Sequence, residues 1–117
     1  ELMWHDPVNA PNLSDMSDEQ VQLLIANRTA LAMYTWDPYM HDPRLKHRLH
    51  RIDVPTLLIW GESDGLVTTD YAKAYQDLIP GAELEIIDNA GHIPQAEQPN
   101  AFVENVIKFA SGEVTGI

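Results

Sequence analysis

Two residues of this sequence, Asp64 and His92, combine side chains that do chemistry with positions just beyond apolar runs. A carboxylate beside an imidazole accepts the Nδ1 proton and fixes the tautomer of the ring. It also stabilises the imidazolium that forms when the ring takes a proton from a nucleophile. The pair therefore predicts general-base chemistry in support of a nucleophile.

The elements that must position this pair follow from the pattern of the second half of the chain. The apolar and β-branched run at 56–60, closed by Gly61, predicts a strand buried on both faces. The further expected elements are a helix at about 70–78, a strand at 83–87 and a helix at 99–110. Because parallel strands place functional residues beyond their carboxyl ends, we expect Asp64 and His92 at one edge of a parallel sheet.

Two parallel strands are not a stable sheet by themselves. Each would leave an unpaired edge and an uncovered apolar face. We therefore expect the missing strands to come from elsewhere, and we predict that the chain is one part of a larger α/β fold whose open edge another segment covers.

The first half of the chain predicts two helices. Ser17, with Gln20 three residues later, is typical of a helix start, and a helical pattern continues to about residue 36 with most apolar groups on one broad face. Pro43 is expected in the first turn of a second helix that reaches residue 52 and carries most of the positive charge on one face.

The loops around the two polar residues resemble one known family, the α/β-hydrolases. Acid before histidine is the order of that family. The stretch 55–64 resembles the strand and loop that present its acid, and 89–94, followed by 97–99, resembles the loop that presents its histidine. The resemblance covers roughly residues 52–110.

This resemblance implies a fold and a division of the chain. Residues 52–117 would be the C-terminal part of the α/β-hydrolase core, with two parallel strands and crossover helices. Residues 1–51 would be a helical cap or lid segment. Asp64 would be the catalytic acid and His92 the catalytic base, without any cofactor.

One motif needs a separate interpretation. The stretch 61–65 fits G-x-S-x-G, the pattern of a nucleophile elbow, with Ser63 at its centre. We do not interpret Ser63 as the nucleophile, because the family that the chain resembles has its nucleophile far upstream of the acid. Asp70 suits a helix start and Asp88 lies just ahead of the histidine loop, so Asp64 remains the expected acid.

Composition narrows the class of partner. The formal net charge of −11 repels phosphate backbones and anionic lipid surfaces, so nucleic acid is not expected as a partner. The absence of cysteine excludes disulfides and thiol catalysis. His47 and His50 are too few for a metal site, and no apolar run is long enough for a membrane span. A cytoplasmic location is the default expectation.

The sequence thus predicts a cofactor-free hydrolase with a serine nucleophile that the chain itself lacks, so the chain alone should be inactive. The expected substrates are small apolar esters or related acyl or C–C compounds. The residues expected to line the substrate site are Leu66, Val67, Ile93 and Trp36.

Two alternatives stay open. The intact protein could use an aspartate nucleophile, as haloalkane dehalogenases and epoxide hydrolases do. The chain could also be a non-catalytic split subunit or a binding module. Its expected partner is the N-terminal half of the same hydrolase or another copy of the chain.

Overall fold

The computed structural model describes residues 2–112, and their contacts divide the chain into two units. One unit holds residues 2–10 together with 46–112, and the other is Pro11–Leu45. Residues 2–10 and 46–51 thus group with the strands, and the division after residue 51 that the sequence indicated stays a prediction. The cap role of the first 51 residues stays a prediction.

The larger unit is built on two parallel strands, β1 (Leu57–Gly61) and β2 (Glu83–Ile87). They pair in register from Leu57 opposite Glu83 to Gly61 opposite Ile87, so their carboxyl ends lie side by side. The expected strand at 83–87 is confirmed, and the strand at 56–60 is displaced by one residue. Apart from Gly61 the residues of β1 are only half-buried, which corrects the expectation of burial on both faces.

Helix α2 (Thr69–Leu78) makes the crossover between the strands and contacts both of them. Its small residue Ala72 is fully buried, and Ile79 beyond its end is nearly so. Gly81 then turns the chain toward β2 with a φ of 71°, a conformation that only glycine adopts without strain. The core of this unit therefore lies between α2 and the strand pair.

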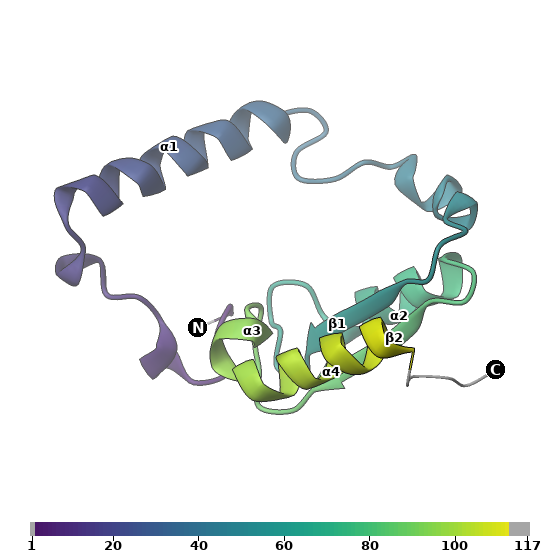
Figure 1. Ribbon diagram of the computed structural model, residues 1–117. Helices are drawn as coiled ribbons and strands as arrows, with labels where there is room; N and C mark the ends of the chain where they lie inside the picture. The colour runs from purple at the N-terminus through teal and green to yellow at the C-terminus, as the bar shows by residue number, and fades with distance from the viewer. Residues whose placement is uncertain (1, 113–117) are drawn as a thin grey trace. The chain divides into compact units, whose positions relative to one another are not determined.

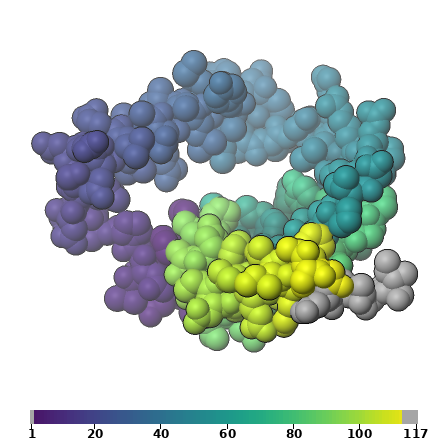
Figure 2. Space-filling view, in the orientation of Figure 1, coloured from purple at the N-terminus to yellow at the C-terminus, as the bar shows by residue number. Residues whose placement is uncertain are grey.

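Helix α4 (Pro99–Ser111) follows the single-turn helix α3 (Pro94–Glu97) and contacts β2. Proline in its first turn and Gly112 in the left-handed conformation at its end are typical helix boundaries. Figure 1 shows α4 in front of the strands and α2 behind them, so helices flank both faces of the pair. In Figure 2 α3 and α4 form one continuous surface on the face toward the viewer.

The smaller unit consists mainly of helix α1 (Asp18–Tyr34). Ser17 accepts a hydrogen bond from the amide of Gln20, and the Gln20 side chain accepts one from the amide of Ser17, which confirms the predicted helix start. The helix buries no residue, and its apolar residues are spread around it instead of lying on one side, so the single broad apolar face expected from the sequence was wrong.

The predicted second helix, at 43–52, was also wrong. This stretch forms two short 3₁₀ turns, Leu45–His47 and Leu49–Arg51. Leu49 is the only residue of these turns that is buried, and a short helix without an extended buried face is not stable in water. Within residues 2–112 no helix is both long and apolar enough to span a membrane.

Candidate active site

The acid loop begins where β1 ends. Its amides form hydrogen bonds to the end of β2 and the loop that follows it. The amide of Glu62 donates to the carbonyl of Ile87 at 2.9 Å, and that of Ser63 donates to the carbonyl of Ala90 at 2.9 Å. The indole of Trp60 donates to the carbonyl of Val67 at 2.7 Å. These bonds tie both ends of the loop to the framework, so the position of Asp64 between them is well defined.

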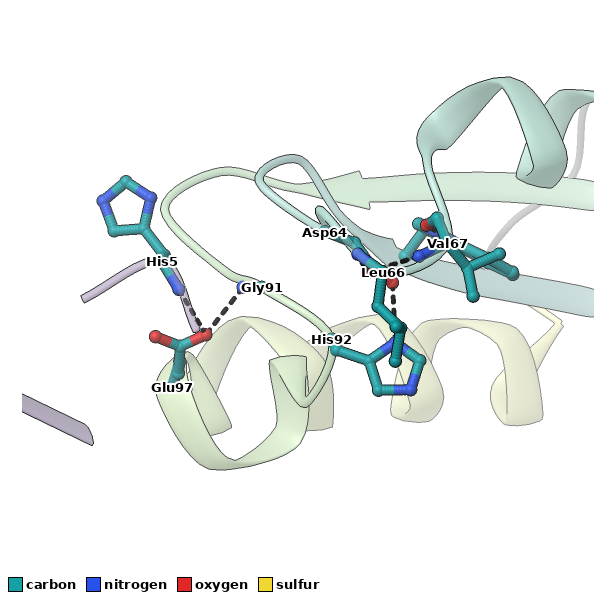
Figure 3. A network of polar contacts seen from close by, with 8 residues as sticks. His5, Asp64, Leu66, Val67, Gly91, His92 and Glu97 are labelled. Atoms are coloured by element: carbon teal, nitrogen blue, oxygen red, sulfur yellow. Dashed lines mark hydrogen bonds and ion pairs between the residues drawn. The ribbon is translucent and has the colours of Figure 1, made fainter. Parts of the chain in front are cut away.

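Asp64 is buried, and both of its carboxylate oxygens are occupied. Oδ1 accepts the amides of Leu66 and Val67, each at 2.9 Å, and Oδ2 lies 2.9 Å from Nδ1 of His92 (Figure 3). The two hydrogen bonds from these amides restrict rotation of the carboxylate, so Oδ2 stays directed at the imidazole. Asp64 is the only charged residue that is buried in the part of the chain the structure describes.

His92 comes from the loop that follows β2. Its backbone amide donates to the carbonyl of Met3 at 2.7 Å, and the preceding amide of Gly91 donates to Glu97 at 2.6 Å. The His92 side chain keeps about a third of its surface exposed, whereas that of Asp64 is almost fully covered. The sequence prediction that both strand ends bring these two residues together is confirmed by this contact.

The contact also determines what the ring can do. An ionised carboxylate only accepts hydrogen bonds, so the Nδ1 atom facing Asp64 carries the proton and Nε2 is left as the acceptor. Figure 3 shows the second ring nitrogen directed away from Asp64. An imidazole in this tautomer can take a proton from a hydroxyl that approaches Nε2.

The other predicted site residues differ in their positions. Val67 and Ile93 are half-buried beside Asp64 and His92 in sequence, and Leu66 is half exposed. Trp36 is largely exposed and belongs to the smaller unit. Their role in lining a substrate site stays a prediction.

Ser63 does not meet His92 in this structure. Its hydroxyl lies 2.8 Å from Nδ1 of a different histidine, His5, and its side chain is exposed. The Nδ1 atom of His92 faces Asp64 instead. Residues 2–112 also hold no group of three or more histidine, aspartate or glutamate residues that could bind a metal ion.

Glu97 is a residue of this site that the sequence analysis did not single out. Burial acts to raise its pKa, but hydrogen bonds from the amides of Gly91, His5 and Asp6 and from the side chain of Asn9 outweigh this, so the pKa lies below its ordinary value. The available signal was its place five residues after the histidine. Its partners could not be foreseen, because three of them come from the distant N-terminal segment.

The chain is similar in sequence to known peptidases and esterases. Proline iminopeptidase of Lactobacillus crispatus is 33% identical over 76 residues, which is 65% of this chain and 26% of that protein. Carboxylesterase YbfK of Bacillus subtilis is 36% identical over 56% of this chain, and its crystal structure superposes on 57% of the chain with a TM-score of 0.54. These matches cover 23% and 24% of the carboxylesterase.

A bacterial membrane phospholipase A shares the fold over more of the chain. Its crystal structure matches 95% of this chain and 35% of its own, with a TM-score of 0.72 and 20% identity. The chain spans about a quarter to a third of the length of the curated relatives it matches. The family described as alpha/beta hydrolase fold matches residues 18–99. Because this match covers well over half of the sequence, the chain belongs to the α/β-hydrolase fold family.

Proposed function

We propose that this chain supplies the acid and the base of a serine-type hydrolase that acts on small apolar esters or related acyl or C–C compounds. The observation that carries the proposal is the 2.9 Å contact between Asp64 Oδ2 and His92 Nδ1, with Oδ1 held by two backbone amides. The carboxylesterase among the relatives favours ester substrates.

In the proposed mechanism His92 Nε2 takes the proton of a serine hydroxyl as the oxygen attacks the carbonyl carbon of the substrate. Asp64 holds the ring and stabilises the imidazolium without being protonated itself. The imidazolium then gives its proton to the leaving group as the bond to the carbonyl carbon breaks, and the acyl group stays on the serine. His92 next takes a proton from water, which attacks the acyl carbon and releases the acyl product and the serine.

The nucleophile is proposed to lie outside these 117 residues, in an N-terminal half of the same hydrolase or in another chain. Two observations support this: Ser63 faces His5 instead of His92, and the chain spans only part of its relatives. Under the same proposal the chain alone is inactive. Leu66, Val67, Ile93 and Trp36 are proposed to contact the substrate, and residues 1–51 to act as a cap.

The first test replaces His92 by alanine in the protein that carries this chain. We expect hydrolysis of p-nitrophenyl acetate to fall to the background rate, because no base remains to activate the serine, while the far-UV circular dichroism is unchanged. His50→Ala is the matched control, since His50 is an exposed histidine on a 3₁₀ turn. Full turnover by the His92→Ala variant would exclude the proposed mechanism.

A fluorophosphonate probe identifies the nucleophile in the same samples, because it reacts only with an activated serine. Labelling of the wild type and loss of labelling in His92→Ala support a serine enzyme. An esterase that turns over but takes no label would indicate an aspartate nucleophile. Absence of both turnover and labelling would instead favour the split subunit or binding module.

A further inference from the structure

The carboxylate of Glu97, on α3, accepts four hydrogen bonds. Three come from the N-terminal segment and one comes from the histidine loop. Oε1 accepts hydrogen bonds from the backbone amide of Asp6 and from the side-chain amide of Asn9, both at 3.1 Å. Oε2 accepts the amide of His5 at 3.2 Å and that of Gly91 at 2.6 Å. Figure 3 shows this carboxylate between His5 on one side and the histidine loop on the other.

Residues 2–9, which we call the N-terminal strap, touch both catalytic loops as well. The carbonyl of Leu2 accepts the amide of Gly65 at 3.0 Å in the acid loop. The carbonyl of Met3 accepts the amide of His92 at 2.7 Å. The start of the strap is therefore hydrogen-bonded to the backbone beside Asp64 and to the backbone of His92. Glu97 binds the rest of the strap, at residues 5, 6 and 9.

The histidine loop packs tightly against the strap. A Cβ atom on Gly91 would lie 2.4 Å from the carbonyl oxygen of Met3 and 2.9 Å from the amide nitrogen of His5. Successive amides of this loop thus point to two anchors, Gly91 to Glu97 and His92 to Met3. Loss of either anchor would remove one of the two hydrogen bonds that hold the peptide carrying the imidazole.

The chemistry of the anchor requires a carboxylate. All four partners of Glu97 are N–H donors, and a carboxylate offers only acceptors. A glutamine in the same place would offer a single oxygen and turn an NH₂ group toward other donors. Charge-assisted bonds of this kind are also about twice as strong as neutral ones.

We propose that Glu97 is a positioning residue that, through Gly91 and the N-terminal strap, holds the imidazole of His92 against Asp64. The inference rests on the proposed function of the Asp64–His92 pair and adds to it a residue outside the pair. The hydrogen bonds of Glu97 go to Gly91 and to the strap, and the side chains of Asp64 and His92 bind each other.

The test compares Glu97→Gln with Glu104→Gln in the protein that carries this chain. Glu104 is the matched control because it is an exposed glutamate of α4 whose partner is Lys108. For p-nitrophenyl acetate we expect kcat of Glu97→Gln to fall on the order of 10- to 100-fold with KM little changed, since small displacements of a base cost rate more than binding. Glu97→Asp should recover part of the loss, because it keeps the charge but not the reach.

A spectroscopic readout separates positioning from a general loss of structure. The proton on His92 Nδ1 should give a low-field NMR signal in the wild type and in Glu104→Gln. This signal should move upfield or broaden in Glu97→Gln while the amide signals of β1 and β2 stay in place. If Glu97→Gln does not fold, the same comparison is made with Glu97→Asp.

The outcomes separate this inference from the proposed function. Wild-type kcat and an unchanged low-field signal in both Glu97 variants would overturn the positioning role, even if His92→Ala is inactive. Full turnover by His92→Ala would instead remove the proposed function. In that case the low-field signal still decides whether Glu97 holds the imidazole.

Discussion

At the residue scale, Asp64 divides its two oxygens between two tasks. Oδ1 binds the amides of the loop that follows it, and Oδ2 binds the imidazole. A carboxylate with only the imidazole as partner could rotate and release it. Because the carboxylate is also buried, water does not compete for Oδ2, and the ring is held in the tautomer that leaves Nε2 as an acceptor.

Glu97 leads to a prediction about pH. Its pKa in the folded protein lies below the ordinary value of 4.5, so its stabilising contribution is present above that value and is lost as the pH falls through the folded pKa. We expect Glu97→Gln to unfold with about 2 kcal/mol less free energy than the wild type at neutral pH, by the usual range for bonds to a charged group. This difference should shrink as the pH falls below about 4.5, because position 97 loses its charge only in the wild type.

Urea unfolding of the protein that carries this chain, at a series of pH values, measures this difference. The other ionisable groups of the chain are the same in both proteins, so their effects largely cancel in the comparison. Glu104→Gln serves as the exposed control. A constant difference between wild type and Glu97→Gln from neutral to acid pH would show that the charge of Glu97 contributes nothing.

At the element scale, the end of β1 and the histidine loop approach each other more closely than a side chain allows. Gly61 is buried, and a Cβ atom there would lie 2.0 Å from the carbonyl oxygen of Gly91 and 2.5 Å from that of Ala90. Both clashing atoms belong to the backbone, so they cannot move aside as a flexible side chain would. This contact brings the acid loop and the histidine loop together.

Gly61→Ala is therefore expected to destabilise the protein strongly. Overpacking against backbone should cost about 3 kcal/mol of unfolding free energy, at the upper end of the usual range. Gly65→Ala is the comparison, since its nearest contact, the carbonyl oxygen of Leu2, lies at 3.1 Å and needs only a small shift. Thermal unfolding of the two variants measures the effect, and equal melting temperatures would show that the loops can separate at no cost.

At the scale of the whole molecule, the described residues bury little apolar surface. None of their large side chains is fully buried, and the two strands pair only with each other. Ile86 on β2 and a row on α4 remain exposed; the exposed members of that row are Val103, Val106 and Ile107. A pair of strands with so small a core supplies little of the free energy that folding needs.

The 117-residue chain expressed by itself should therefore lack a cooperative unfolding transition. We expect a shallow urea profile, binding of the dye ANS to exposed apolar surface and rapid amide exchange in β1 and β2. Under the proposed function, addition of the N-terminal half of the hydrolase should restore a sharp transition. A sharp transition and slow exchange in the chain alone would contradict this prediction and favour a self-sufficient module.

The sequence alone was sufficient to predict where the strands, the crossover helix and the acid and histidine loops of the larger unit lie along the chain. Strand and helix periods are local, so 83–87 and the helix that starts at 99 could be recognised from neighbouring residues. The capping pair Ser17 and Gln20 is equally local. The position of a polar residue after each parallel strand then placed Asp64 and His92 together, because adjacent strand ends share one edge.

Tertiary structure decided what no local pattern contains. The prediction of a helix at 43–52 was wrong. Its pattern was helical, but of the two 3₁₀ turns that form there only Leu49 is buried, so no packed face stabilises a helix. The anchor at Glu97 joins residues about ninety positions apart, and its donors are mostly backbone amides, which carry no sequence signature. Periodicity predicts which elements form, whereas the contacts between distant backbones that hold His92 against Asp64 exist only once those elements have packed.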